Sequence, residues 1–177
     1  KAGDHLICSD DVYGGTFRLF DKVTQHNGVQ FSYVDLSNLD AIRKAIKPNT
    51  KMLWIETPTN PLLKLVDIKA VSAIAREKGI ISVVDNTFMS PYFQRPLELG
   101  ADITYHSTTK FVNGHSDVIG GAVITNSKDL ADRIYFLQKS MGAIASPFDS
   151  YLCMRSLKTL PVRMQAHDRN GRAVAEF

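Results

Sequence analysis

Short apolar runs of strand length alternate with amphipathic stretches through most of the chain, and this alternation constrains the fold more than any other feature. The expected strands cover residues 5–8, 30–34, 51–55, 80–84, 103–106 and 119–125. The stretches between them place apolar residues on one helical face. Repeated strand–helix alternation predicts an α/β domain with a mostly parallel sheet sandwiched by helices.

Several residues predict where these helices begin and end. The stretch 13–26 is expected to be one helix, and Ser37, with Asp40 three residues on, is typical of a helix N-cap. Asp67 is expected to cap the helix that Gly79 ends. A further helix is expected after Ser127, and the last residues are expected to form a long helix that begins near Phe148.

Composition excludes several classes of function. The chain has 177 residues, 44% hydrophobic and 22% charged, which is typical of a soluble domain or a large part of one. A net charge of +3 does not favour nucleic acid or a membrane surface, and no apolar run spans a bilayer. The five histidines lack zinc-type spacing, so no metal site is expected. Two distant cysteines imply no disulfide framework and favour a reducing, cytoplasmic compartment.

Polar residues that follow the expected strands are the candidate site residues, because ligands of parallel sheets bind outside the carboxyl ends of the strands. Asp85 follows the apolar run 80–84, where a charge is costly unless it is paired. A protonated pyridine nitrogen would be a suitable partner, since the ring could then accept electrons from a carbanion. The alternative is that Asp85 caps the next turn.

The segment after the strand at 51–55 reads Glu-Thr-Pro-Thr-Asn-Pro, residues 56–61. Two prolines force an extended, rigid loop, which holds Asn60 in one place. From there the Asn60 amide could donate to a ring substituent such as a phenolate oxygen. A stiff surface turn is the alternative.

An aromatic residue and an arginine follow the first strand. Tyr13 could stack on a flat cofactor, and Gly14 and Gly15 allow close backbone approach. Arg18, one helical turn on, could bind an anion through its bidentate fork. The alternatives are a core tyrosine and a surface arginine.

Lys110 lies in the segment Ser-Thr-Thr-Lys-Phe-Val-Asn-Gly-His-Ser, residues 107–116. Its amine could hold a phosphorylated aldehyde as an imine. Ser107 and Thr109 point the same way in an extended segment, so both hydroxyls could reach the phosphate. Taken alone, Lys110 would be a solvated surface lysine. Because four such segments each follow a strand, their convergence indicates pyridoxal phosphate as the cofactor.

These segments resemble the Cys/Met-metabolism enzymes that use pyridoxal phosphate. The attachment signature of that family reads here as Asp-Ile-Thr-Tyr-His-Ser-Thr-Thr-Lys-Phe-Val-Asn-Gly-His-Ser at 102–116, and the segments 10–16, 56–61 and 83–88 also match. The resemblance covers the whole chain but only the middle of the family's length. It implies that residues 1–177 are an incomplete large domain of the type I, aspartate aminotransferase-like fold, ending in the helix that leads to a C-terminal domain.

The resemblance also implies roles for the matching positions. Lys110 would be the Schiff-base lysine and proton shuttle, and Asp85 would pair with the pyridinium nitrogen. Tyr13 would stack on the ring and face the substrate. The remaining implied roles are the phenolate contact for Asn60, phosphate contacts for Ser107 and Thr109, a place near substrate entry for Arg18, and loop support for Glu56.

Outside these motifs, the segments 136–155, 157–160 and 89–96 look most like cystathionine γ-lyase. The resemblance therefore implies γ-elimination of cystathionine to cysteine, 2-oxobutanoate and ammonia, by a homotetramer when the protein is full length. Cystathionine γ-synthase and methionine γ-lyase are alternatives, and a non-catalytic cofactor-binding fragment is an alternative from another class. The family's substrate-carboxylate arginine lies in the C-terminal domain, so the segment alone is expected to be inactive.

Overall fold

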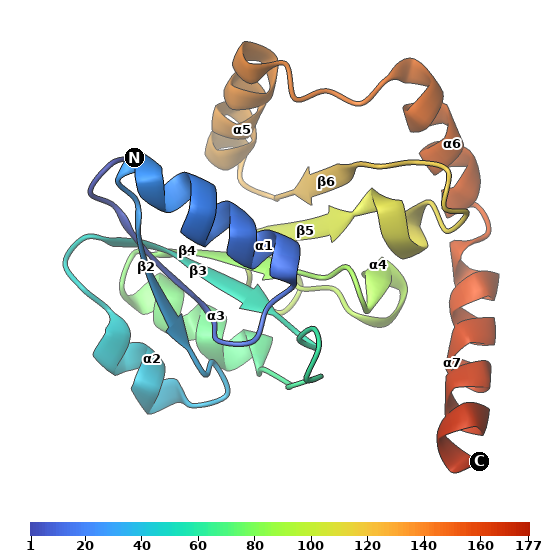
Figure 1. The fold of residues 1–177 in the computed structure, drawn as a ribbon, viewed down its shortest axis with the longest axis horizontal. Coiled ribbons are helices and arrows are strands. Elements are labelled where there is room, and N and C mark those ends of the chain that lie inside the picture. The colour runs from blue at the N-terminus through green and yellow to red at the C-terminus, as the bar shows by residue number, and fades with distance from the viewer.

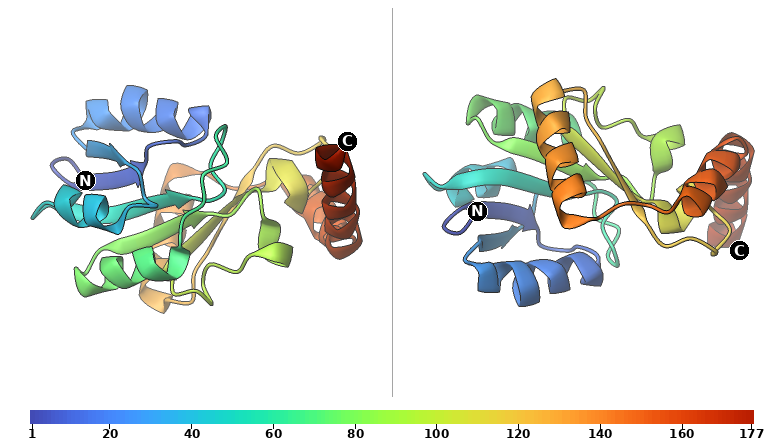
Figure 2. Two further views of the ribbon diagram at one scale, coloured as in Figure 1. Left: turned by 90° about the horizontal axis from the view of Figure 1, so that it is seen from below. Right: turned by 90° about the horizontal axis from the view of Figure 1, so that it is seen from above.

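A computed structural model describes residues 1–177 and shows a six-stranded sheet with helices on both faces (Figures 1 and 2). The sheet has the order β2-β1-β3-β4-β5-β6. Its strands are β1 His5–Ser9, β2 Gln30–Val34, β3 Thr50–Glu56, β4 Ile81–Asp85, β5 Ile103–Ser107 and β6 Gly121–Ile124. The first five are parallel and β6 runs antiparallel to β5, so the predicted, mostly parallel sheet is confirmed.

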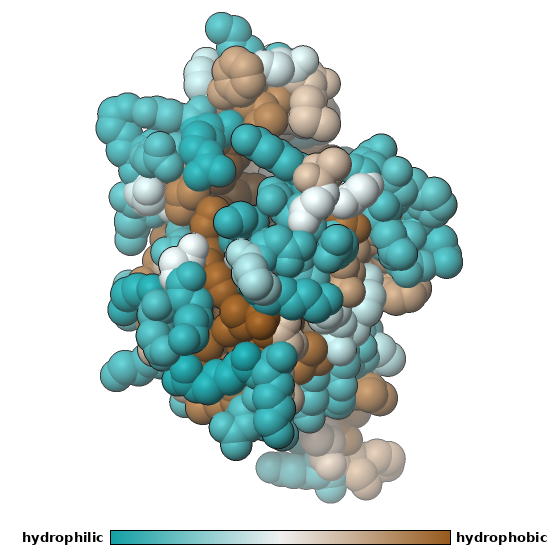
Figure 3. Space-filling view, turned by 90° about the vertical axis from the view of Figure 1, so that its left-hand side faces the viewer, coloured by the Kyte–Doolittle hydropathy of each residue, from teal (hydrophilic) through white to brown (hydrophobic).

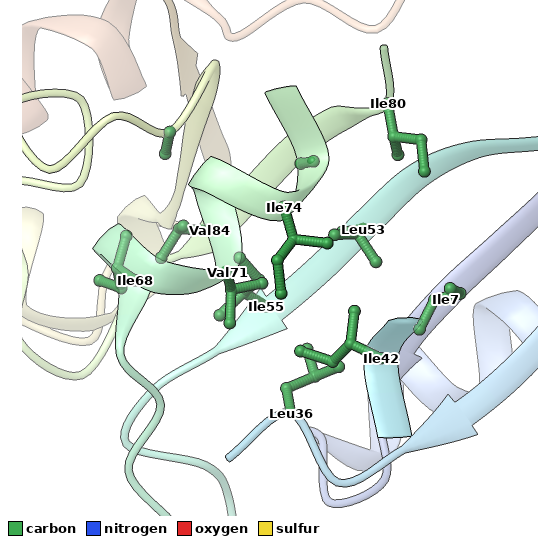
Figure 4. Close-up of a cluster of buried hydrophobic side chains, with 12 residues drawn as sticks. Ile7, Leu36, Ile42, Leu53, Ile55, Ile68, Val71, Ile74, Ile80 and Val84 are labelled. Carbon is green, nitrogen blue, oxygen red and sulfur yellow. The ribbon is translucent and has the colours of Figure 1, made fainter. Parts of the chain in front are cut away.

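Side-chain alternation along the strands supplies a core on each face of the sheet. Ile7, Leu53 and Ile55 are fully buried on the face that is covered by α2 (Leu39–Ala45) and α3 (Ile68–Glu77). Figure 4 shows this larger cluster, in which isoleucine, leucine and valine side chains from strands and helices interlock. The opposite face buries Cys8 and Phe20 in a smaller cluster.

The helix that covers this opposite face is continuous but changes its winding. It consists of α1 (Gly14–Arg18), a wider π-helical segment (Leu19–Thr24) and a tighter 3₁₀ turn (Gln25–Asn27), and it ends at Gly28 with φ of 83°. The prediction of a helix over 13–26 is therefore confirmed. The side of the molecule that lies at the left of Figure 1 is largely hydrophilic and is crossed by one hydrophobic band (Figure 3).

Helix caps agree with the sequence at two places and differ at a third. Asp67 and Ser127 accept hydrogen bonds from Ala70 N and Leu130 N, as expected, at the starts of α3 and α5 (Lys128–Met141). The prediction of Ser37 as the cap of α2 is wrong. Its hydroxyl donates to Asp35 Oδ1 at 2.7 Å, and Asn38 is the cap instead, accepting from Ala41 N at 3.0 Å.

The last part of the chain forms two helices, so the single long helix expected from near Phe148 is wrong. They are α6 (Pro147–Leu157) and α7 (Leu160–Glu176), which lie past the carboxyl end of β5 (Figure 1). The break occurs at Lys158 and Thr159 because Pro161 lacks an N–H and its ring would collide with the carbonyl of Leu157 in a continuous helix. The remaining helical turns are α4 (Ser90–Phe93) and a turn over Thr108–Val112. None of the helices combines the length and the apolar character that crossing a membrane requires.

Candidate active site

A cavity of ≈ 720 Å³ opens at the carboxyl ends of β1, β3, β4 and β5. The predicted site residues that line it are Tyr13, Glu56, Asn60, Asp85, Ser107, Thr109 and Lys110. Four segments that are far apart in the sequence therefore meet at one place, at the edge of the sheet that the ligand rule indicates. Arg18 is exposed on α1 and does not line the cavity, so its contact with a substrate stays a prediction.

Asp85 ends β4 with a buried carboxylate whose two oxygens differ. Its Oδ1 accepts from the Thr87 hydroxyl at 2.6 Å and from Thr87 N at 3.0 Å, so it does cap the next turn. Its Oδ2 accepts no hydrogen bond within the chain. Burial raises the pKa of Asp85, and the two Thr87 bonds oppose this shift. A cation at Oδ2 would stabilise the ionised form.

Thr87 connects Asp85 to the lysine-bearing segment. While its hydroxyl donates to Asp85, the same Oγ1 accepts from Ser107 N at 2.9 Å. One side chain therefore sets the spacing between the carboxylate at the end of β4 and the hydroxyl at the end of β5. The alternative expectation, that Asp85 caps the next turn, is confirmed at Thr87, whereas the bond from Ser107 N to the same hydroxyl was not expected from the sequence.

Glu56 is the buried end of β3 and holds two loops with one carboxylate. Tyr13 N donates to its Oε2 at 3.0 Å and to Oε1 at 3.2 Å, and Asn60 N donates to Oε1 at 2.9 Å. Burial raises the pKa of Glu56 to about 7, and neighbouring Asp85 adds to the shift while the hydrogen bonds from Tyr13 and Asn60 oppose it. Both residues that are expected to contact the cofactor ring thus have their main chains fixed by Glu56.

A second buried carboxylate, Asp11, joins the same loops. Its Oδ2 accepts from the Thr59 hydroxyl and, at 2.9 Å, from Leu62 N. The expected rigidity of residues 56–61 therefore has a cause beyond proline, because Glu56 and Thr59 in the loop, and Leu62 directly after it, are hydrogen-bonded to Tyr13 or Asp11. Neither Asp11 nor Thr59 was singled out from the sequence.

Tyr13 is 48% exposed and stands at the cavity wall. The glycine that follows it by two residues makes room for its ring, because a Cβ on Gly15 would lie 2.3 Å from Tyr13 Cε1. Gly15 thus allows the Tyr13 ring to lie close to the main chain at residue 15. Its neighbour Gly14 has no such crowding, since the nearest atom to a Cβ there is at 3.8 Å.

Lys110 departs from helical geometry, with φ of −95° and ψ of −127°, inside the turn Thr108–Val112. The extended geometry expected for 107–109 stops at Ser107, because the chain turns there. Ser107, Thr109 and Lys110 nevertheless all face the same cavity. Thr109 is held in place by its Oγ1, which accepts from Gly120 N at 3.0 Å.

Two aromatic residues complete the wall and were missed from the sequence. Trp54 and Tyr105 line the cavity with ring centroids 5.8 Å apart. Burial raises the pKa of Tyr105, with smaller contributions from Asp85 and Tyr13. Residues two apart in a strand point to the same side of the sheet, and this pattern could have identified both residues. Trp54 lies two residues before Glu56, and Tyr105 lies two before Ser107.

The polar atoms left without a partner match the groups of pyridoxal phosphate. Four polar groups on residues that line the cavity form no hydrogen bond within the chain. They are Lys110 Nζ, Asp85 Oδ2, the Asn60 side-chain amide and Ser107 Oγ. An amine, an anion, an amide donor and a hydroxyl suit an aldehyde, a ring cation, a phenolate and a phosphate respectively. The residues present therefore fit this cofactor.

Comparisons with known proteins agree with this geometry. A family model described as "Cys/Met metabolism PLP-dependent enzyme" matches residues 1–177. The chain is 60% identical over 178 residues to a cystathionine gamma-lyase of Rattus norvegicus, with 100% of the chain and 45% of that protein covered. It is 55% identical over 177 residues to a probable cystathionine gamma-synthase of Herpetosiphon aurantiacus, with 100% and 56% covered.

A solved structure gives the same result for the fold. The crystal structure of cystathionine gamma-lyase from Lactobacillus plantarum complexed with L-serine matches with a TM-score of 0.98 and 49% identity, over 99% of this chain and 46% of that one. The fold expected from the resemblance is confirmed. The chain spans about half the length of the curated relatives it matches.

Proposed function

Because the chain belongs to the Cys/Met metabolism family of pyridoxal-phosphate-dependent enzymes, we propose that the whole protein is a carbon–sulfur lyase that converts cystathionine to cysteine, 2-oxobutanoate and ammonia. Residues 1–177 would be the cofactor-binding part of its large domain. One observation carries this proposal: four side chains line the same cavity, and each has a polar group that forms no hydrogen bond within the chain. They are Lys110, Asp85, Asn60 and Ser107.

Each residue of this set has a chemical task that its position supports. Lys110 would bind the cofactor aldehyde covalently and then move a proton at the substrate α-carbon. Asp85 Oδ2 would keep the ring nitrogen protonated, while Asn60 orients the ring. Bound there, the cofactor supplies a cationic ring that accepts electrons from the α-carbon.

The remaining residues position the cofactor and limit its movement. Ser107 and Thr109 would hold the phosphate with their hydroxyls, and Tyr13 would cover the ring while its main chain stays fixed by Glu56. A ring held between an aromatic face and fixed polar groups presents its reactive carbon in one orientation, which favours a single reaction geometry.

The choice of γ-elimination is supported by resemblance to γ-lyases in residues 136–155, outside the chemistry. Overall identity does not rank the reactions, because γ-lyases of Rattus norvegicus and Bacillus subtilis match at 60% and 52%, a β-lyase of Lactococcus lactis at 56% and the Herpetosiphon γ-synthase at 55%. The second candidate is γ-synthase activity, which that relative favours and which would join an activated homoserine ester to cysteine. Methionine γ-lyase activity and a non-catalytic cofactor-binding role are the further outcomes that an assay distinguishes.

We also propose a cytoplasmic homotetramer for the whole protein. Apolar side chains on α5 and α6 stand exposed, and assembly would bury them; they are Tyr135, Phe136, Met141 and Phe148. Both cysteines are free, in keeping with a reducing compartment. Sedimentation of the whole protein gives the oligomeric state directly.

The test is a product assay on the whole protein with cystathionine, methionine and an O-acylhomoserine plus cysteine in parallel. Cysteine and 2-oxobutanoate from cystathionine are expected, and Lys110→Ala should abolish both products and the visible absorbance of attached cofactor. Lys139→Ala, an exposed lysine of α5, is the matched control. Absence of the absorbance in the unaltered protein would refute the cofactor assignment. Residues 1–177 alone are expected to be inactive, and release of 2-oxobutanoate by them would contradict that.

A further inference from the structure

Arg163 of α7 reaches back to the segment that follows Lys110. Its Nη1 donates to the Phe111 carbonyl at 2.8 Å, and its Nη2 donates to the Ser156 carbonyl at 3.0 Å. Its Nε donates to Thr159 Oγ1 at 3.1 Å. The acceptors are all neutral, and the planar fork of arginine suits a bridge between two carbonyl groups.

Gly114 provides the space that this guanidinium occupies. A Cβ on Gly114 would lie 2.3 Å from Arg163 Nη1 and 2.7 Å from its Cζ. Gly114 also has φ of 76°, which disfavours residues with a side chain. Its N–H donates to the Lys110 carbonyl at 2.7 Å. The same glycine therefore closes the turn on Lys110 and admits Arg163.

The junction of α6 and α7 packs against this turn at a second point. Ser156 Oγ lies 3.1 Å from His115 Nδ1 and 3.4 Å from Asn113 Oδ1, and Asn113 is fully buried. One helical turn after Arg163, the ring of His167 lies 5.0 Å from that of Phe111. Figures 1 and 2 show α6 and the start of α7 beside the turn that follows β5.

The turn has two main-chain hydrogen bonds of its own, from Asn113 N to the Thr108 carbonyl and from Gly114 N to the Lys110 carbonyl, and neither one uses the Phe111 carbonyl. Lys110 has non-helical dihedral angles within Thr108–Val112, and the last carbonyls of a helical turn have no partner inside it. The Phe111 carbonyl, next to Lys110 in the chain, takes its hydrogen bond from Arg163. Arg163 does not line the cavity, so any effect it has on the site passes through the main chain at 110–114.

We propose that Arg163 is a positioning residue for Lys110: by holding the Phe111 carbonyl through the space left at Gly114, it fixes the turn that aims the lysine amine into the cavity. This inference rests on the proposed role of Lys110 in cofactor attachment. It connects the reactive lysine to α7, a helix that lies outside the sheet and its two cores.

The test compares the rate at which pyridoxal phosphate attaches to Lys110 in the whole apoprotein and in Arg163→Met, followed by absorbance and by borohydride trapping with peptide mapping. A hydrogen bond from a charged donor contributes enough to predict a decrease of roughly tenfold or more in Arg163→Met. Arg163→Lys keeps the charge but cannot bridge two carbonyls, so it should not restore the rate. Arg169→Met, an exposed arginine of the same helix, should attach cofactor at the unaltered rate.

Hydrogen exchange at the Gly114 amide is the second readout, because it does not depend on the cofactor. We expect exchange about tenfold faster in Arg163→Met and Arg163→Lys than in the unaltered protein and Arg169→Met. Unchanged attachment and unchanged exchange in Arg163→Met would overturn the inference. If the unaltered protein attaches no cofactor, the proposed function fails. Even then, an unchanged exchange rate at the Gly114 amide in Arg163→Met would separately refute the claim that Arg163 fixes this turn.

Discussion

Glu56 and Asp85 lie side by side at the ends of β3 and β4, paired in the register of the sheet. Both carboxylates are buried, and each has a task at the cavity: Glu56 binds the main chains of Tyr13 and Asn60, and Asp85 keeps Oδ2 free. Two like charges at this spacing disfavour joint ionisation. A cation paired with Asp85 would favour the ionised form of both carboxyl groups, so under the proposed function cofactor binding would be coupled to the ionisation of Glu56.

This coupling predicts how stability depends on pH. The pKa of Glu56 is raised from 4.5 to about 7 in the folded protein, so the folded state binds more protons than the unfolded state between these values. The contribution of Glu56 to the free energy of unfolding should therefore fall as pH rises through this window, by roughly 3 kcal/mol, while burial lowers the pKa of His5 and His106 and gives them a contribution of opposite sign. Denaturant unfolding at pH 5 and pH 8 measures it. Glu56→Gln should lose the Glu56 contribution, and an unaltered slope in that variant would rule out Glu56 as its source.

Thr87→Val should weaken both the fold and the cofactor site. The substitution removes the hydroxyl that donates to Asp85 Oδ1 and accepts from Ser107 N, so Ser107 N loses this acceptor and the buried Asp85 carboxylate keeps only the bond from the main-chain N of residue 87. We expect a loss of about 2–3 kcal/mol in the free energy of unfolding and a higher dissociation constant for pyridoxal phosphate. Thr87→Ser retains the hydroxyl and is expected to retain most of both properties, as urea unfolding and cofactor titration would show.

Gly15→Ala should displace the ring of Tyr13, because the added methyl group would lie 2.3 Å from Tyr13 Cε1. Loss of an aromatic contact of about 0.5–1.5 kcal/mol predicts a several-fold weaker affinity for the cofactor. Gly14→Ala is the matched control, since its Cβ meets nothing closer than 3.8 Å. Equal cofactor affinity in the two variants would argue against a role for Tyr13 in binding the ring.

The start of α2 can be tested by two neighbouring substitutions. Asn38→Ala removes the side chain that accepts from Ala41 N and should cost about 1 kcal/mol in the free energy of unfolding. Ser37→Ala removes only an exposed bond to Asp35 and should cost less. A larger loss for Ser37→Ala, measured by thermal or denaturant unfolding, would favour the cap that the sequence pattern indicates.

Much of the fold follows from local pattern, because strands and helices here bury apolar residues with regular spacing. Asp67 and Ser127 cap their helices as expected, whereas Ser37 does not, because Asp35 competes for its hydroxyl. The break between α6 and α7 could have been predicted at Pro161, which a continuous helix from near Phe148 does not accommodate. The carboxyl-end rule placed the cavity correctly, because parallel strands bring their ends to one edge of the sheet.

The sequence by itself determined which side chains gather at the cavity and at which sheet edge they do so, since strand ends and the types of side chain that follow them are local properties. Only the tertiary structure decided how those side chains are held. Three side chains join segments that are separated along the chain. Thr87 connects Asp85 with Ser107, Glu56 binds the main chains of two loops, and Arg163 binds the Phe111 carbonyl. Such contacts depend on where turns direct the main chain, which no local pattern specifies.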